Sequence, residues 1–445
     1  MFKKSILLCA ISLLSTDAIS KNLFTVYEKG MTYNAQILSA EKSYDKEKEN
    51  VSLYSSALKP KLGFQANAHR ADIDITSSNY DTSYSGLNYS IKFQQPLYDP
   101  SSYAKLDLSK IGAKFAKAEF EEVKDQKGFE IVQSYFDYLR FQNNVLISKR
   151  KENALESQLK RVRKEYSLGA ANKLHLNEAV NAYDIARVET LASRGRLEIA
   201  QENLARQTGE YYTDLTSIDH RAKMFNVDKN IEEWKNEAVK NNFTIKKILK
   251  AREASEKNID VAKSEYKPTI NFFISYEHLD RNDDVSLQGG DRNDLVFGIE
   301  FNYQIYKGGS TTSKVKKANH DFQKVNYDYL DVIRGVSAEI KKVYRNFQLT
   351  IENIEAKKNA LASSFEALDA TKKGFSLGQR NLQDVINSEK VYYDTLLSYV
   401  NSKYDYITQY FYLEFLSGNL NESTVMSISN WMSKVEDKGD LNNEL

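Results

Sequence analysis

Side chains that could carry out chemistry are sparse in this 445-residue chain, and their spacing fits no catalytic arrangement. The glycine pairs at 289–290 and 308–309 stand alone rather than within a phosphate-binding loop. The dense carboxylates are spread along what we expect to be solvated helix faces, which is their usual role. Five histidines lack the spacing of a metal site such as HxxxH: His69, His175, His220, His278 and His320. The sequence therefore gives no support for an enzyme, a metal site or a cofactor.

The single cysteine lies in a segment that we expect to be removed. Met1-Phe2-Lys3-Lys4 is basic, residues 5–15 are mostly apolar, and Ala18-Ile19-Ser20 is a small-x-small cleavage pattern. This combination predicts a secretory signal peptide over residues 1–20. Because Leu8 rather than a small residue precedes Cys9, we expect no lipid anchor, and the mature chain then has no thiol.

The elements that must position any functional residue are repeated within the chain. Lys59-Pro60-Lys61-Leu62 opens one apolar run, and Lys267-Pro268-Thr269-Ile270 opens another 208 residues later. Tyr98 and Tyr306 share this offset, and Ser167-Leu168-Gly169 recurs after 209 residues as Ser376-Leu377-Gly378. The period far exceeds the ~20–50 residues of solenoid repeats, so the chain is a duplicated unit. We assign residues 1–20 to the signal peptide, 21–228 to the first repeat, 229–421 to the second, and 422–445 to a C-terminal segment.

Each repeat contains two runs that alternate apolar and polar residues with the period of a β-strand. The strands are expected at about residues 61–70, 86–97, 269–278 and 294–305, with surface loops at 71–85 and 279–293. The alternating runs within them are about 9–11 residues long, which suits tilted strands in a bilayer. Periodicity alone favours two solvated hairpins packed on helices. The bulky aromatic face and the charges Lys92 and Glu300 on the opposite face favour membrane strands instead.

Long helices follow each strand pair. Residues 101–166 and 311–375 lack proline, and apolar residues such as Leu155, Leu159 and Val162 recur at spacings of three and four. This is a narrow, coiled-coil-like seam, with charges on the other faces that include Lys149, Lys151 and Glu152. Such a helix is about 100 Å long, and return helices are expected at 172–207 and 382–416. A soluble coiled-coil spacer would show the same pattern.

Charge and strand number limit the assembly. A net charge of +1 offers no strong basic field for nucleic acid. No apolar run after residue 20 reaches the ~18 residues of a transmembrane helix.

Four strands cannot close a barrel, which needs at least about eight. Open strand edges in lipid cost several kcal/mol for each unsatisfied backbone group. Strands in a membrane would therefore need a dimer, with eight strands, or a trimer, with twelve.

Several short segments, taken in order along the duplication, resemble one family. They are Gln207-Thr208-Gly209-Glu210-Tyr211-Tyr212, Tyr306-Lys307-Gly308-Gly309, Gly374-Phe375-Ser376-Leu377-Gly378-Gln379-Arg380, Asp384-Val385 and Leu416-Ser417-Gly418-Asn419-Leu420. With the order of elements, they resemble the TolC family of outer-membrane efflux and secretion channels over nearly the whole mature chain. The absent lipid cysteine is more similar to the TolC-like branch than to the lipoprotein branch.

The resemblance implies an α+β membrane protein of the Gram-negative outer membrane, with a large periplasmic part. Three chains would form a twelve-stranded β-barrel continued by an α-helical periplasmic barrel, with a mixed equatorial region near residues 210–235 and after 419. The implied function is the exit duct of a tripartite efflux pump or type I secretion system. Its partners would be two further copies, outer-membrane lipid, a periplasmic adaptor and an inner-membrane pump or ABC exporter, and no nucleic acid.

The cargo stays open, between small molecules and proteins. Two other classes also stay open on the residues alone: a periplasmic coiled-coil adaptor and a secreted structural coiled coil. An adaptor would usually need an inner-membrane anchor and β-domains flanking a single hairpin, whereas this chain has two hairpins.

The resemblance also implies a periplasmic gate after the second turn. Asp384 matches the first acidic ring, and Asn387 stands where a second aspartate is often found. Arg380 matches an arginine that locks neighbouring helices. Phe375 replaces the expected tyrosine, and His175 occupies the position of an expected acid, so the lock would be weaker or rewired. Whether His175 makes the gate pH-sensitive stays open. Independently of the family, Asp384 is also a first-turn acid that a helix dipole favours.

The two turns themselves are the implied docking sites for the adaptor. Each glycine also suits a left-handed helix cap, whatever binds there. The residues concerned are Leu168, Gly169 and Ala170 at the first turn, and Leu377, Gly378 and Gln379 at the second.

Overall fold

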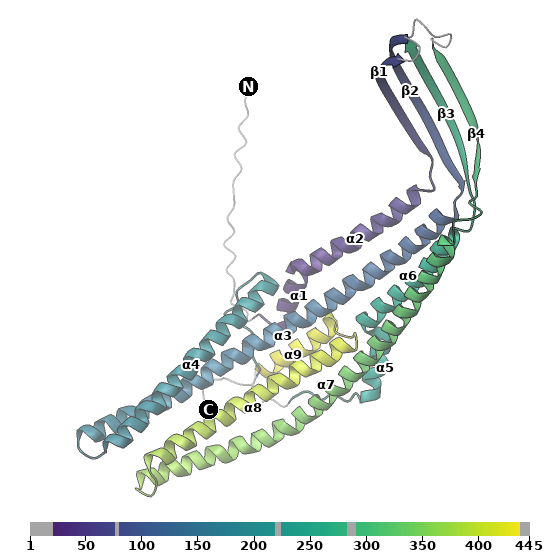
Figure 1. Cartoon of the computed structure of the whole chain (residues 1–445). Coiled ribbons are helices and arrows are strands. Elements are labelled where there is room, and N and C mark those ends of the chain that lie inside the picture. The colour runs from purple at the N-terminus through teal and green to yellow at the C-terminus, as the bar shows by residue number, and fades with distance from the viewer. Residues whose placement is uncertain (1–20, 76–79, 219–223, 283–290, 437–445) are drawn as a thin grey trace, which may run out of the picture. The chain divides into compact units, whose positions relative to one another are not determined.

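The computed structural model describes residues 21–75, 80–218, 224–282 and 291–436, and its elements follow the expected duplicated order (Figure 1). The first repeat contains α1 (Leu23–Tyr33), α2 (Ala35–Ser56), β1 (Lys61–Ile75), β2 (Tyr80–Tyr98), α3 (Pro100–Ser167) and α4 (Lys173–Thr208). The second contains α5 (Ile231–Asn241), α6 (Phe243–Ser264), β3 (Thr269–Asn282), β4 (Arg292–Asn302), α7 (Ser310–Ser376), α8 (Leu382–Leu416) and α9 (Glu422–Glu436). The expected signal peptide and His220 lie outside the described residues.

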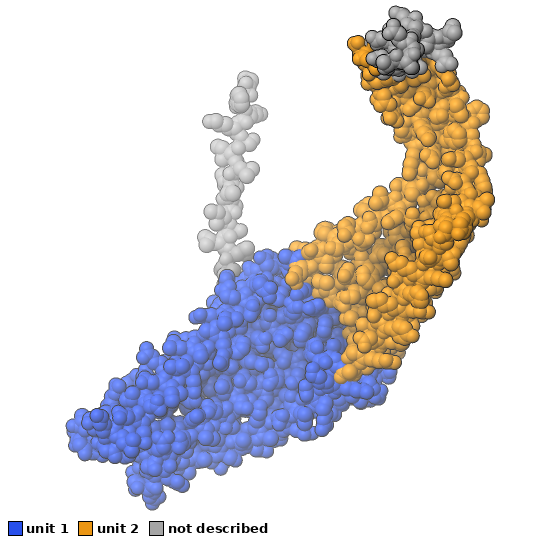
Figure 2. Space-filling view, viewed as in Figure 1, with its two compact units in different colours: residues 1–35, 125–236, 339–445 blue, residues 36–124, 237–338 orange. Residues whose placement is uncertain are grey.

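Two compact units each draw on both repeats (Figure 2). Unit 1 comprises residues 1–35, 125–236 and 339–445, and unit 2 comprises residues 36–124 and 237–338. The four boundaries fall after the first residue of α2 and inside α3, α5 and α7. The duplication in the sequence is thus not a division into two successive globular domains.

The strands of unit 2 form one antiparallel sheet in the order β1-β2-β3-β4. Leu62 pairs with Phe93, and 208 residues later Ile270 pairs with Phe301. Shifting the β1–β2 register by this offset therefore reproduces the β3–β4 register. The duplication holds residue by residue in the sheet.

One face of this sheet carries the bulky apolar side chains that the alternation predicts. Phe64 on β1 is 70% exposed, and Phe297 and Ile299 on β4 are 73% and 67% exposed. Farther along the same face, the rings of Tyr89 and His278 stack with centroids 4.6 Å apart. A continuous exposed apolar face of this kind marks contact with lipid or with another chain.

The strands extend beyond the expected ranges, and the prediction of loops over the whole of 71–85 and 279–293 is wrong. β1 continues to Ile75 and pairs with a β2 that begins at Tyr80. Polar residues such as Asp72 suggested a loop, but ladder hydrogen bonds join backbone groups and tolerate polar side chains. Residues 76–79 and 283–290 lie outside the described residues. At its other end β4 stops at Asn302, short of the expected 305.

The core of unit 1 is aromatic and fully enclosed. Tyr135 and Phe136 on α3, with Tyr404 and Phe411 on α8, are among its largest buried side chains. The Tyr135 hydroxyl donates to the carbonyl oxygen of Thr216 at 2.8 Å, so this buried polar group is satisfied. The rings of Phe136 and Phe411 lie 5.8 Å apart, so α3 and α8, one helix from each hairpin, pack together in this core.

The hairpin helices match the sequence expectation to within a residue or two. α3 and α7 end at Ser167 and Ser376, and α4 and α8 begin at Lys173 and Leu382. Pro100 is the first residue of α3. A backbone N–H at this position has no acceptor within the helix, so the N–H that proline lacks is not missed. The absence of proline farther along explains why each long helix is unbroken.

Candidate functional site

Both hairpin turns lie at the same end of unit 1 and share one backbone conformation (Figure 1). Gly169 has a φ of 74° and Gly378 a φ of 72°. The Ala170 N–H donates to the Glu165 carbonyl oxygen at 2.8 Å, and the Gln379 N–H donates to that of Gly374 at 2.8 Å. This is the left-handed glycine cap expected from the sequence.

The expected docking residues form an exposed knob at each turn. Leu168 is 74% exposed and Leu377 is 72% exposed. A Cβ atom added at Gly169 or Gly378 would meet nothing within 4 Å. A partner surface could therefore approach the backbone of both turns closely; that an adaptor does so stays a prediction.

The return helices begin with matching asparagine caps. The Asn172 side chain accepts from the His175 backbone N–H at 2.8 Å, and that of Asn381 accepts from the Asp384 N–H at 2.8 Å. Asp384 also accepts from the Asn381 N–H at 3.2 Å, which completes a capping box on α8. The interpretation of Asp384 as a first-turn helix acid is confirmed. A role in selectivity would come in addition to this local one.

Three of the four gate candidates lie together at the start of α8. The nearest guanidinium nitrogen of Arg380 is 4.0 Å from Asp384 Oδ2, and Gln383 donates to Asn387 Oδ1 at 3.0 Å. A Cβ on Gly374 would lie 2.9 Å from Arg380 Cγ, so glycine there makes room for this side chain. Within the described residues, the His175 side chain makes no hydrogen bond or ion pair with these three.

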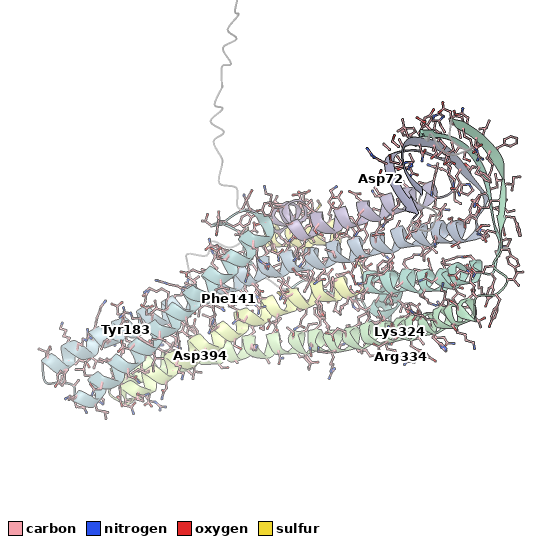
Figure 3. All side chains as sticks on the ribbon, turned by 45° about the horizontal axis from the view of Figure 1, so that its top comes forward. Asp72, Phe141, Tyr183, Lys324, Arg334 and Asp394 are labelled. Atoms are coloured by element: carbon pink, nitrogen blue, oxygen red, sulfur yellow. The ribbon has the colours of Figure 1, made fainter. Side chains whose placement is uncertain are left out.

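An apolar cluster joins the first hairpin to α8 behind the turns. Its buried members come from α3, α4 and α8: Leu155, Leu159, Val162, Ala179, Ala186, Leu382 and Ile386. Tyr183 on α4, which is labelled in Figure 3, and Phe375 near the end of α7 pack against it. Leu155, Leu159 and Val162 of the α3 seam expected from the sequence therefore lie in a cluster with residues of α4, α7 and α8.

A buried lysine links the same three helices farther from the turns. Lys151 on α3, with a side chain only 7% exposed, lies 2.8 Å from Glu189 on α4 and 3.0 Å from Asp394 on α8. Asp394 is labelled in Figure 3. Burial disfavours its ammonium, but the hydrogen bonds to both carboxylates outweigh burial and raise the pKa of Lys151. The charge is thus retained and ties the first hairpin to α8.

The Lys151 link borders a groove of about 210 Å³ between α4 and α8. Its polar lining includes Glu178, Gln383 and Asn387, and its apolar lining includes Leu155 and Ile386. One gate candidate therefore faces a groove of its own chain.

The expectation that Lys151 and Glu152 lie on solvated faces is wrong, since both residues are buried. The sequence did carry a signal, because Lys151 precedes Leu155 by four residues and so continues the apolar seam. A charged residue at a seam position needs a partner, and its partners here come from distant parts of the chain.

Two further properties bear on function. Among residues 21–75, 80–218, 224–282 and 291–436, none of the helices combines the length and hydropathy that crossing a membrane requires. The same residues contain no cluster of three or more histidines, aspartates or glutamates that could hold a metal ion.

Comparison with known proteins gives consistent matches over most of the chain. The sequence profile of the family described as "Outer membrane efflux protein" matches residues 27–210 and 234–419. Outer membrane protein TolC of Vibrio cholerae is 25% identical, over 94% of this chain and 96% of that protein. Alkaline protease secretion protein AprF of Pseudomonas aeruginosa is 20% identical, over 92% and 87%. The fold matches the Campylobacter jejuni CmeC outer membrane channel with a TM-score of 0.77 at 14% identity, covering 92% and 89%.

Proposed function

Since the chain belongs to the outer membrane efflux protein family, we propose that it forms the homotrimeric exit duct of an export system. The protein is a TolC-like outer membrane channel with a periplasmic helical extension, and not an enzyme. The alternatives of a periplasmic adaptor and a secreted coiled coil are thereby excluded.

The observation that carries the homotrimer is the open sheet. β1 and β4 are edge strands, and every residue of both whose burial is described is exposed or half-buried. The apolar face would meet lipid, but the unpaired backbone groups of both edges need partners there. Channels of the TolC family form trimers, and three copies would close a twelve-stranded barrel.

The duplication supplies the register of that closure. β2 pairs with β3 so that Phe93 meets Ile274 and Tyr89 meets His278. A residue of β2 corresponds to the residue 208 positions later, in β4. A residue of β3 corresponds to the residue 208 positions earlier, in β1. The same register between neighbouring copies pairs Phe301 with the next copy's Ala66, and Ile299 with its Ala68. This pairing keeps the apolar side chains of both strands on one face.

The finer assignments are part of the same proposal. The partners are a periplasmic adaptor, which docks at Leu168–Ala170 and Leu377–Gln379, and an inner-membrane pump or ABC exporter. Asp384 of each copy forms an acidic ring that favours cations, and Arg380 restrains α8. The names of the similar proteins include both efflux and protease secretion, and we propose that the partner transporter selects the cargo.

Fractionation and channel recording test this proposal together. The protein should appear in the outer membrane as a trimer that resists detergent, and deleting its gene should block export of one cargo class. Purified trimers should give cation-selective channels in planar bilayers. A monomer released with the soluble periplasmic fraction would contradict the proposal.

A further inference from the structure

The two turns share a backbone but differ in charge. We define the first tip as residues 160–175 and the second tip as residues 369–384, which correspond at an offset of 209. The Ser167 and Ser376 hydroxyls each donate to the carbonyl three residues earlier at 2.8 Å, so the match extends to side-chain bonds. A difference in side-chain charge is therefore not a consequence of a different fold.

The first tip carries an exposed and unpaired set of cations. Lys160 is paired with Glu156 at 2.7 Å. The other cations of this tip are exposed and have no ion-pair partner within the described chain: Arg161, Arg163, Lys164 and Lys173. They lie in the last two turns of α3 and the first turn of α4, on either side of the exposed Leu168. With Glu165 as the one carboxylate of residues 160–175, this surface is an apolar knob within a net positive charge.

The second tip is largely neutralised. Lys372 lies 2.9 Å from Glu389, whose side chain is 4% exposed, and Lys373 lies 2.6 Å from Asp369. Arg380 lies 4.0 Å from Asp384. The positions that match Arg161 and Lys173 are the uncharged Ala370 and Leu382. Its exposed Leu377 is therefore set among paired charges.

This difference has a physical consequence for any partner that meets both tips. Unpaired surface charges act over a Debye length of about 10 Å at 0.1 M salt and mainly set orientation and rate of association. Paired charges act over less distance because their fields cancel. A partner can thus distinguish the two tips although their backbones are alike.

We propose that the first tip docks a protein surface with carboxylates around an apolar recess, whereas the second tip docks by shape alone. This rests on the proposed function, in which the partner is the periplasmic adaptor. The cations would pair with the carboxylates, and Leu168 would fill the recess. Nucleic acid would use the cations but leave Leu168 exposed, which makes an acidic protein the better fit. Because of this charge difference, equivalent adaptor hairpins would bind the first tip before the second tip.

The test begins by identifying the partner at each tip. A photoreactive residue at Ser167 or Ser376 of the full-length protein should capture the same adaptor in intact cells. Binding of that purified adaptor to purified trimers is then measured for Arg161→Gln/Arg163→Gln/Lys164→Gln and for the control Lys341→Gln/Arg345→Gln/Lys358→Gln. The control removes three exposed cations of α7 that lie outside the second tip.

The triple variant should weaken binding about tenfold at 0.1 M salt, because exposed charge pairs contribute modestly and add up. The control should change binding less than about twofold, and about 1 M salt should erase the difference through screening. Lysines in place of the adaptor's carboxylates should restore binding to an Arg161→Glu/Arg163→Glu variant.

Three results would overturn the inference. Equal binding by the triple variant and the control would mean that the cations are only solvated. Loss of binding to phosphatidylglycerol vesicles, with adaptor binding unchanged, would assign the patch to a membrane surface instead. Capture of no adaptor at either tip, by trimers that still conduct, would remove adaptor docking while leaving the channel in place.

Discussion

Replacing Lys151 with methionine should loosen α8 from the first hairpin. Methionine retains most of the buried stem but removes the ammonium, which leaves Glu189 and Asp394 facing each other without a cation. Breaking a fully buried ion pair costs about 3–5 kcal/mol. Here the two carboxylates are 42% and 52% exposed, so water can solvate them. We therefore expect a loss of about 1–2 kcal/mol after that discount.

Hydrogen exchange of the intact trimer measures this loss locally. Amides of α8 near Asp394 and of α4 near Glu189 should exchange about 5–30-fold faster, because local opening becomes easier by that free energy. Lys149→Met is the matched control, since Lys149 pairs with Glu152 but is 41% exposed itself. Adding Asp394→Asn to the Lys151 variant should recover part of the loss by removing one of the two facing carboxylates.

Equal exchange in the Lys151 and Lys149 variants would refute this reasoning. It would mean that the apolar cluster alone holds α8 to the first hairpin. Faster exchange throughout the chain would equally contradict a local link.

Three further predictions concern the turns, the gate and pH. Asp384→Asn should keep the α8 cap but abolish cation selectivity in planar bilayers, whereas Asp384→Ala should also speed exchange in the first turn of α8; unchanged selectivity in both would leave only the capping role. Gly169→Ala and Gly378→Ala should each cost about 1 kcal/mol locally, because both glycines have positive φ, and asparagine should cost less. Gly195→Ala, inside α4 with open space at the Cβ, should instead stabilise that helix. Hydrogen exchange that is slower in the Gly169 and Gly378 variants than in the Gly195 variant would be inconsistent with the cap geometry. Burial raises the pKa of Asp137, with Arg140 opposing, so its ionised form destabilises the fold at neutral pH. Asp137→Asn should raise the unfolding temperature at pH 7, and this gain should shrink as pH falls toward the unfolded value of 3.8; a gain that did not depend on pH would point to a cause other than ionisation.

The elements with local signals were predictable from the sequence. The turns at Gly169 and Gly378 and the helix ends around them depend on a glycine cap and an asparagine cap, both of which act within a few residues. The strand register could be anticipated from the 208-residue offset because a strand has a strict period of two.

Features that depend on distant residues were not predictable. β1 extends to Ile75 because β2 pairs with it there, which its own polar residues do not reveal. Lys151 is buried because Glu189 and Asp394 approach it from two other helices. The same holds for the second tip, where Glu389 neutralises Lys372 from the next helix. In each case the chain's tertiary contacts decide the environment of a polar side chain.

Closure of the sheet between neighbouring copies is the central claim, and a disulfide tests it most directly. Within one chain β1 and β4 are separated by two strands, about 14 Å apart, so cysteines at Ala68 and Ile299 cannot join inside a copy. Oxidation of the Ala68→Cys/Ile299→Cys variant in outer membranes should give covalent trimers on a non-reducing gel. Ala68→Cys/Phe301→Cys, displaced by two residues or about 7 Å, should give few. Monomers from both variants, or equal crosslinking by both, would contradict the proposed twelve-stranded barrel and its register.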